Sequence, residues 1–436
     1  MARMLIRGGN PLHGTITVSG SKNSALAIMA AAGLAEEECI LENVPRQYDV
    51  WTMAMILRSI GAEVWFDAAG RLHINGKGIR PVSPPYDLVR RIRASFYVAG
   101  LLLALRGYAE VPLPGGCSIG SRPVNFHIKG FEQLGAKVTI EHGCMKARAP
   151  KLTGTHYFIN RASVGTTINM LLAACRAEGT TILENAAKEP EVVDVAIFLN
   201  SMGARIRGAG TDVIRIDGAT RLSGVEHTII PDRLEAATFA IAVGTVGGRV
   251  TLHNVMPEHL RSPIMKLREA GLTIEENDAS LTVSGEGRMQ AVDIETAVYP
   301  GFPTDLQQPF VSMLSLADGT SVVRETVFDG RFRYVDELLR MGADIKVERD
   351  TAIVRGVERL TGAPVEVTDL RAGAALMIAG LAAEGETELS QAHIIDRGYE
   401  QFDDKLRTLG ADVRRVDVDE EDVPDFTVLG EASVAL

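Results

Sequence analysis

Residues 57–64 read Leu-Arg-Ser-Ile-Gly-Ala-Glu-Val, an apolar helical stretch that ends at Gly61 and continues as a short strand-like run. The same pattern recurs five more times, with intervals of 74, 68, 68, 71 and 68 residues between its glycines: Gly61, Gly135, Gly203, Gly271, Gly342 and Gly410. Glycine readily adopts the left-handed conformation that ends a helix, so each one is predicted to turn a helix into a strand. Self-similarity at a fixed period indicates a chain built from six repeated units.

A second pattern is interleaved with the first, in which an Ala/Leu-rich helix passes through a turn into another strand, as at residues 34–43, 176–185 and 382–389. Each unit therefore contains two helices and several strands. The Ala/Leu-rich helices are apolar almost all round, which is typical of buried helices. We expect an α/β fold of two halves with three units each, the helices inside and the sheets outside.

Bulk composition narrows the function classes. The net charge of −11 argues against a general nucleic-acid or membrane-surface binder, because those partners are anionic. No apolar run approaches the roughly 18–20 residues that span a bilayer, and the N-terminus lacks the apolar core of a signal peptide. The single cysteines Cys39, Cys144 and Cys175 are predicted to be small core residues. Without C-x-x-C pairs or other ligand clusters we expect no disulfide and no metal, and we expect a cytoplasmic protein.

The starts of the Ala/Leu-rich helices carry an unusual set of residues. Ser, Thr and Asp are ordinary N-caps, and Asp232 with Glu235 would form a capping box. Cations, however, also stand where the helix dipole is already positive, at Lys22, Arg93, Arg233 and Arg371. That arrangement is favourable when an anion lies there, so the helix starts predict an electropositive site for small phosphate- and carboxylate-bearing molecules.

Loops of the second, fifth and sixth units add three arginines and one thiol: Arg122, Arg331, Arg397 and Cys117. Cys117 lies in the glycine-rich run 113–123, which is incompatible with a helix or sheet interior. An exposed thiol close to Arg122 is the setting of a reactive cysteine. We therefore predict that Cys117, unlike the other three, takes part in chemistry.

The motifs together resemble those of the UDP-N-acetylglucosamine 1-carboxyvinyltransferases, a family of enolpyruvyl transferases. The similarity covers residues 5–416 and is carried by Ser19–Asn23, Arg93–Ser95, Pro114–Cys117, Arg122–Val124, Ser163–Gly165, Glu189–Asp194, Pro231–Arg233, Phe302–Asp305, Glu325–Phe328, Arg331–Phe332, Thr368–Arg371 and Ile395–Glu400. The resemblance implies an inside-out α/β barrel of two domains that close over the substrates. It implies residues 22–231 as one domain, 1–21 with 232–416 as the other, and 417–436 as an acidic, flexible tail.

The implied reaction moves the enolpyruvyl group of phosphoenolpyruvate to the 3-hydroxyl of UDP-N-acetylglucosamine and releases phosphate, the first committed step of peptidoglycan synthesis. The substrates are small molecules, and no cofactor is implied. By resemblance Asp305 acts on the 3-hydroxyl, and Cys117 donates a proton to C3 of phosphoenolpyruvate. The corresponding cysteine of the family also forms an adduct with phosphoenolpyruvate and is alkylated by fosfomycin. Lys22 and Arg397 complete the predicted catalytic set.

Binding residues follow in the same way. Phosphoenolpyruvate is expected at Lys22, Asn23, Arg122, Arg331, Arg371 and Arg397, with its phosphate on Lys22, Arg122 and Arg397 and its carboxylate on Arg331 and Arg371. The sugar nucleotide is expected at Asn23, Arg93, Arg122, Pro123, Val124, Asn125, Phe126, Arg161, Ala162, Ser163, Val164, Gly165, Asp305 and Val327. Glu189, Glu191, Asp232, Arg233 and Asp369 are candidates for domain closure or orientation only.

Two residues depart from the common family pattern. Arg161 stands where many members have Lys, and Asn125 where some have Asp, so contacts to the base are less certain than contacts to the phosphates. Three alternatives stay open: the synthase that uses shikimate 3-phosphate, which lacks the Pro-Gly-Gly-Cys loop; a paralogue that acts on another UDP-sugar; and a non-catalytic sugar-nucleotide-binding paralogue. An assay with each acceptor separates them.

Overall fold

The computed structural model describes residues 3–114, 124–416 and 424–430 of the 436-residue chain. The chain forms two compact units, which we name after their first inner helices. The α1 unit contains residues 20–114, 124–230 and 425–430, and the α8 unit contains residues 3–19 and 231–416. In the described part of the chain, no helix has both the length and the apolar character needed to cross a membrane.

Three helices form the centre of the α1 unit, with α4 (Tyr97–Arg106) in contact with both α1 (Lys22–Ala32) and α6 (Val164–Ala174). The unit's other helices are α2 (Tyr48–Ser59), α3 (Tyr86–Val89), α5 (Asn125–Gln133) and α7 (Pro190–Ser201). Ten of the eleven residues of α1 are buried, because Ala, Leu, Ile and Met occupy nearly every face. This confirms that the Ala/Leu-rich helices are the inner ones.

The sheets of the α1 unit are formed by three sets of strands. They are β13 (Glu226–Thr228), β3 (Cys39–Glu42), β5 (Leu72–Asn75) and β4 (Glu63–Phe66); then β6 (Tyr108–Pro112), β8 (Cys144–Arg148) and β7 (Lys137–Glu141); and β11 (Arg205–Arg207), β12 (Val213–Asp217), β10 (Thr180–Glu184) and β9 (His156–Phe158). Strand β13, from the end of the unit, pairs in parallel with β3 of the first repeat. The last repeat is thereby joined to the first.

The α8 unit has the same plan. Its inner helices are α8 (Arg233–Val246), α10 (Gln307–Leu314) and α12 (Leu370–Ala382), which contact one another, and its other helices are α9 (Arg261–Glu269), α11 (Val335–Arg340) and α13 (Phe402–Thr408). Its sheets are β15 (Thr273–Asn277), β16 (Ser280–Gly285), β14 (Gly248–His253) and β2 (Leu12–Thr17); β17 (Ile294–Glu295), β18 (Thr320–Arg324), β20 (Thr351–Arg355) and β19 (Asp344–Glu348); and β21 (Pro364–Glu366), β22 (Glu386–Ser390), β1 (Arg3–Arg7) and β23 (Asp412–Val416).

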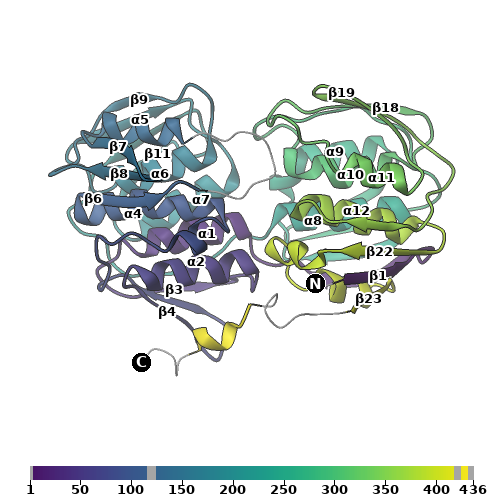
Figure 1. The fold of residues 1–436 in the computed structure, drawn as a ribbon, viewed down its shortest axis with the longest axis horizontal. Helices are drawn as coiled ribbons and strands as arrows, with labels where there is room; N and C mark the ends of the chain where they lie inside the picture. Colours follow the sequence, from purple (N-terminus) through teal and green to yellow (C-terminus); the bar gives the residue numbers. More distant parts are fainter. Residues whose placement is uncertain (1–2, 115–123, 417–423, 431–436) are drawn as a thin grey trace. The chain divides into compact units, whose positions relative to one another are not determined.

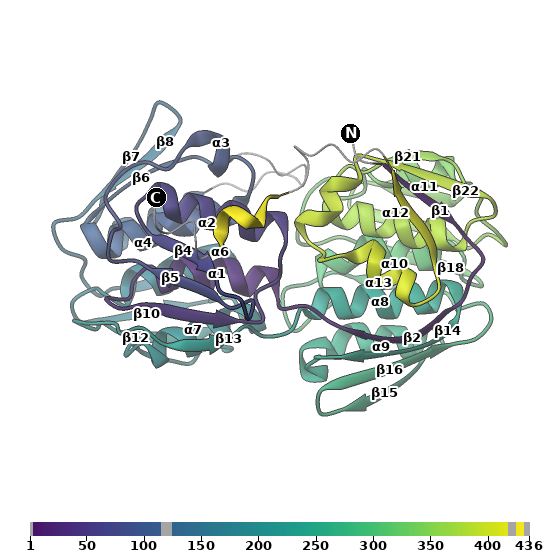
Figure 2. The same ribbon diagram turned by 90° about the horizontal axis from the view of Figure 1, so that it is seen from below.

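Helices lie inside and sheets outside in both units, so the predicted fold class is confirmed. Figure 1 shows this in the α8 unit, where β18, β19, β22, β1 and β23 lie around α8, α10 and α12. Figure 2 shows the N-terminal strands β1 and β2 beside the later strands β22 and β14. The six sheets are separate from one another in the described residues.

All six repeat glycines end a helix as predicted. Gly61 has a φ of 106°, its N–H bonds the carbonyl of Arg58, and the N–H of Ala62 bonds the carbonyl of Leu57. The five other glycines also have positive φ, and each of them, with the residue that follows it, donates the same pair of hydrogen bonds. This pair of hydrogen bonds is the Schellman motif, which satisfies the last carbonyls of a helix.

The predicted N-caps are also formed, with one correction. Ser21, Ser163, Asp232 and Asp369 each accept a backbone N–H of the following helix. The capping box predicted for Asp232 and Glu235 is only half formed. Lys405 binds the Glu235 carboxylate, and the Asp232 N–H bonds the carbonyl of Ser19 instead.

The acidic tail also differs from expectation. The predicted tail spans residues 417–436, of which the structure describes 424–430. Here the short 3-10 helix η6 (Phe426–Leu429) belongs to the α1 unit: Trp51 Nε1 donates to the Asp425 carbonyl at 3.0 Å, and Leu429 is fully buried. Phe426 packs against the core of the α1 unit and Leu429 is buried in it, whereas the sequence prediction made the whole segment a flexible tail.

Candidate active site

In the α8 unit, Asp305 lies between two buried arginines. It belongs to the 3-10 helix η3 (Thr304–Leu306), which leads into α10. Arg331 Nη2 donates to Asp305 Oδ1 at 2.7 Å, and Arg371 Nε, at the start of α12, donates to Asp305 Oδ2 at 3.3 Å. The Arg331 and Arg371 side chains are 1% and 2% exposed, whereas that of Asp305 is 29% exposed. The structure thus brings three of the predicted residues into one cluster with one accessible carboxylate.

Glu325, which the sequence flagged only as part of a motif, organises this cluster. Its buried carboxylate accepts hydrogen bonds from the hydroxyls of Thr296 and Thr304, at 2.9 and 2.8 Å, and from the backbone N–H groups of Val327 and Phe328, at 2.8 and 3.0 Å. Thr304 in turn accepts from Arg331 Nη1. Glu325 therefore fixes both the turn that carries Val327 and the hydroxyl that orients Arg331.

Arg371 is held by its surroundings on more than one side. Its Cζ lies 5.0 Å from the centre of the buried Tyr399 ring, and Tyr399 bonds the Thr238 hydroxyl at 3.1 Å. Burial alone would lower the pKa of Arg371, but Tyr399 and the carboxylates of Asp305 and Asp232 outweigh burial and raise that pKa. The guanidinium is therefore a permanent buried cation, and among the described residues its Nη1 has no hydrogen-bond partner. Arg331 Nε is in the same situation.

Arg397 ends the 3-10 helix η4 (Ala392–Arg397) and is half-buried. The residue before it, Asp396, receives two bonds from Arg415, at 2.6 and 2.8 Å, and Arg415 also bonds Asp403. This ion-pair network anchors η4 to β23 and α13. The backbone that carries Arg397 is thus fixed within the α8 unit.

In the α1 unit, Lys22 is the first residue of α1 and pairs with Asp49 in the first turn of α2. Lys22 Nζ lies 3.1 Å from Asp49 Oδ2, and the two side chains are 8% and 5% exposed. Beside them Asp194 accepts from the Ser24 hydroxyl and lies 2.8 Å from His227 Nε2. Asn23 and Arg93 are half-buried. Arg93 lies in the 3-10 helix η1 (Arg93–Phe96) that precedes α4, so the ordinary α-helix starts later than predicted.

Two helix starts carry the segments predicted for the nucleotide. Asn125 is the exposed first residue of α5, half-buried Val124 and Phe126 flank it, and the Phe126 carbonyl accepts from the Tyr157 hydroxyl. Ser163 caps α6, with half-buried Val164 and Gly165 in its first turn and Ala162 before it. Arg161 is exposed.

His127 joins these two starts and was missed at the level of sequence. Asn169 Oδ1 accepts from the Gly100 N–H, so the Asn169 amide nitrogen donates to His127 Nδ1 at 3.0 Å. Burial, with a smaller effect of Arg93, lowers the pKa of His127 to about 3, so the ring is neutral with its proton on Nε2. A Cβ at Gly165 would lie 3.5 Å from Nε2, so Gly165 keeps α6 close to this nitrogen.

The loop predictions fall partly outside the described residues, which do not include Cys117, Arg122 and Pro123. Cys39 and Cys175 are buried as predicted, and burial raises their pKa values to about 11 and about 12. Cys144 is half-buried on β8, so its assignment to the core is only partly correct. Those three thiols are free of disulfide bonds.

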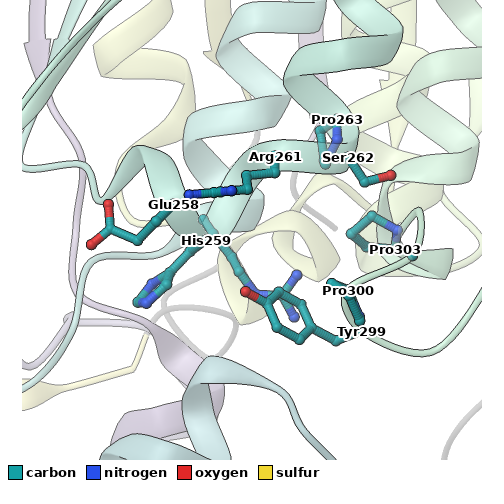
Figure 3. A pocket seen from close by; sticks show the side chains of 10 residues that line it. Glu258, His259, Arg261, Ser262, Pro263, Tyr299, Pro300 and Pro303 are labelled. Carbon is teal, nitrogen blue, oxygen red and sulfur yellow. The ribbon is translucent and has the colours of Figure 1, made fainter. Parts of the chain in front are cut away.

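A small pocket, with a volume of about 30 Å³, adjoins the start of α8 and ends at Pro303, next to η3. Figure 3 shows Tyr299, His259 and Glu258 among its lining residues. Arg233, a candidate for orientation, lines it too, with Cζ 5.6 Å from the Tyr299 ring centre. No cluster of three or more His, Cys, Asp or Glu side chains in the described ranges is arranged to hold a metal ion.

Comparison with known proteins identifies the class of this fold and site. The family model of EPSP synthase (3-phosphoshikimate 1-carboxyvinyltransferase) matches residues 6–406. The crystal structure of the enolpyruvyl transferase NikO from Streptomyces tendae is similar with a TM-score of 0.87 and 26% identity, covering 96% of this chain and 99% of that chain. EPSP synthase from Acinetobacter baumannii shares the fold, with a TM-score of 0.76, 20% identity, and coverage of 96% and 100%. The protein is an enolpyruvyl transferase.

The curated relatives narrow the class further. UDP-N-acetylglucosamine 1-carboxyvinyltransferase 2 of Symbiobacterium thermophilum is 54% identical over 95% of this chain and 98% of its own length. UDP-N-acetylglucosamine 1-carboxyvinyltransferase 3 of Caldanaerobacter subterraneus is 51% identical over 95% and 100%. The chain belongs to the family of UDP-N-acetylglucosamine 1-carboxyvinyltransferases, and this favours the predicted family over the alternatives.

Proposed function

We propose that the enzyme transfers the enolpyruvyl group of phosphoenolpyruvate to the 3-hydroxyl of UDP-N-acetylglucosamine and releases phosphate. The reaction is the first committed step of peptidoglycan synthesis. The observation that carries the assignment at the level of the site is the accessible carboxylate of Asp305 held by two buried arginines, because the reaction needs a base beside cations that bind an anionic substrate.

The carboxylate of phosphoenolpyruvate binds Arg331 and Arg371 in this proposal. Planar guanidinium groups match the two oxygens of a carboxylate, and both arginines have a buried nitrogen that lacks a partner in the described residues. The Glu325–Thr304 contact and the Tyr399 ring support the proposal, since they hold the two guanidinium groups in place. Such preorganised cations lose little free energy on reorienting when substrate arrives.

The phosphate binds Lys22, Arg122 and Arg397, with Asn23 beside Lys22. Lys22 is supported by its position in the first turn of α1, where the helix dipole and the ammonium both favour an anion. The sugar is lined by Asn23, Arg93, Asp305 and Val327. The uridine and diphosphate bind Arg122, Pro123, Val124, Asn125, Phe126, Arg161, Ala162, Ser163, Val164 and Gly165. The α6 start supports a diphosphate because its backbone N–H groups are oriented by the Ser163 cap.

The chemistry is an addition followed by an elimination. The 3-hydroxyl oxygen bonds C2 of phosphoenolpyruvate while Asp305 takes the hydroxyl proton, and Cys117 donates a proton to C3 as the double bond is lost. In the elimination the Cys117 thiolate takes a proton back from C3, the bond from C2 to the phosphate oxygen breaks, and the double bond forms again. The departing phosphate takes the proton held by Asp305, which restores both groups. Cations around the phosphate stabilise the charge that the leaving group carries.

The domain and cellular assignments complete the proposal. Residues 22–231 form one substrate-binding domain, and residues 1–21 with 232–416 form the other. Reduced thiols at Cys39, Cys144 and Cys175 support a cytoplasmic location, where thiols are kept reduced.

A phosphate-release assay with purified protein tests the function. Phosphate is expected when phosphoenolpyruvate and UDP-N-acetylglucosamine are both present, and only background release with either alone. Shikimate 3-phosphate and other UDP-sugars replace the acceptor as matched controls. Absence of release with both substrates at saturating concentration, or faster release with another acceptor, contradicts the proposal. Prior treatment with fosfomycin should abolish phosphate release, because fosfomycin alkylates the family cysteine that Cys117 matches.

A further inference from the structure

The Asp305 carboxylate accepts hydrogen bonds from the two arginines in the way that a substrate carboxylate would. Each of its oxygens accepts from a different guanidinium, Oδ1 from Arg331 at 2.7 Å and Oδ2 from Arg371 at 3.3 Å. Both arginines are nearly sealed from solvent, so each requires an anionic partner to offset the loss of hydration. In this structure a side chain of the protein supplies that partner.

The three partners of the cluster are unequally fixed. Arg331 also donates to Thr304, which is tied to Glu325, and Arg371 lies on the buried ring of Tyr399. Asp305 is far more exposed than either arginine and lies on the three-residue 3-10 helix η3 rather than inside an α-helix. The arginines are therefore a fixed cradle, and the Asp305 carboxylate is the exchangeable member.

We propose that Asp305 is an internal place-holder for the carboxylate of phosphoenolpyruvate. When the substrate carboxylate binds Arg331 and Arg371, it displaces Asp305, whose oxygens then become available to the sugar hydroxyl. Binding of the second substrate thus releases the base, and proton removal is coupled to the presence of phosphoenolpyruvate. The inference rests on the proposed carboxylate site at Arg331 and Arg371.

The exchange predicts an effect on binding opposite to the effect on catalysis. A site occupied by an internal competitor shows an apparent affinity reduced by the fraction of free sites. With Asp305→Asn, which keeps the shape and removes the charge, the affinity for phosphoenolpyruvate should rise on the order of tenfold while turnover falls. Asp305→Ala should give the same direction, and it serves as the second variant if the amide binds the arginines.

Binding is measured by calorimetry on the full-length protein, with the 3-deoxy analogue of UDP-N-acetylglucosamine at saturation, because it lacks the attacking hydroxyl. Cys117→Ser in every sample prevents the covalent adduct. Vinyl phosphate, which is phosphoenolpyruvate without its carboxylate, is the control ligand. Asp329→Asn is the control variant, since Asp329 is an exposed carboxylate two residues before Arg331 and its loss changes the net charge equally.

Tighter binding of phosphoenolpyruvate, but not of vinyl phosphate, by both Asp305 variants supports the place-holder. Unchanged affinity in both variants overturns it, as does equal tightening for vinyl phosphate or in Asp329→Asn. Melting curves provide a second measurement, because phosphoenolpyruvate should raise the melting temperature of Asp305→Asn more than that of the parent protein. Arg371→Lys separates the two hypotheses: if it leaves phosphoenolpyruvate affinity unchanged, the proposed carboxylate site is wrong, whatever the Asp305 variants show.

Discussion

The Lys22–Asp49 pair of the α1 unit and the Arg331–Asp305–Arg371 cluster of the α8 unit are built from the same kinds of groups. Each has a cation at a helix start, Lys22 on α1 and Arg371 on α12, and each pairs its cations with a carboxylate. In the α1 unit both partners are buried, whereas in the α8 unit the arginines are buried and the carboxylate is only half-buried. The difference fits the roles that we propose, with Asp49 as a permanent partner of Lys22 and Asp305 as a carboxylate that exchanges and takes part in chemistry.

Asp305→Ala tests the half-buried carboxylate and should have the largest effect. Loss of a general base lowers turnover by about 10²- to 10⁴-fold, and we expect kcat to fall by roughly 10³-fold. The measurement is steady-state phosphate release. Turnover within tenfold of the parent protein would show that Asp305 is as structural as Asp49 and would remove the contrast between the units.

Lys22→Ala tests the buried pair and should act mainly on binding. Truncating one partner of a buried charge pair costs about 2–5 kcal/mol, so the KM for phosphoenolpyruvate should rise roughly a hundredfold. Asp49→Asn is the control, because it breaks the same ion pair but leaves the cation. If Asp49→Asn raises this KM as much as Lys22→Ala does, the role of Lys22 is confined to the ion pair.

The Lys405–Glu235 pair provides a third comparison, with a smaller effect. Burial raises the pKa of Glu235 to about 7 despite Lys405. Because its pKa is higher in the folded than in the unfolded state, Glu235 adds stability at low pH that is lost as pH rises through about 7. The free energy of unfolding should therefore fall by about 2 kcal/mol more between pH 5.5 and pH 8 in the parent protein than in Glu235→Gln.

Urea denaturation of both proteins at the two pH values measures this difference. An equal change in the parent protein and the variant would contradict it. Turnover of Glu235→Gln should stay within a fewfold of the parent value, since Glu235 is fully buried behind the start of α8. If Glu235→Gln lost as much turnover as Asp305→Ala, burial would not distinguish structural from catalytic carboxylates in this protein.

Sequence patterns predicted what is local in the chain. The six helix-ending glycines and the caps Ser21, Ser163 and Asp369 were predictable because each depends on backbone geometry within a few residues. The inner helices were predictable because their composition excludes an exposed face. These signals sufficed for the repeat plan.

Partners far apart in the chain were not predictable in the same way. Nothing in the local pattern pairs Lys22 with Asp49, Glu325 with Thr304, or His127 with Asn169, because the fold alone brings them together. The half-formed capping box shows the same limit. Lys405, 170 residues beyond Glu235, competes for the carboxylate that local rules assign to the helix start.

The placement of β1 has a consequence for synthesis. Residues 3–7 pair with β22 and β23, in a register that joins Met4 to Leu389 and Arg3 to Val416. The ribosome therefore releases this strand long before its partners, so its unpaired edge needs protection while the intervening chain emerges. The α1 unit, which needs only residues 425–430 from the late chain, can close most of its core earlier. Vectorial translation thus imposes an order in which the Lys22 half of the enzyme matures before the Asp305 half.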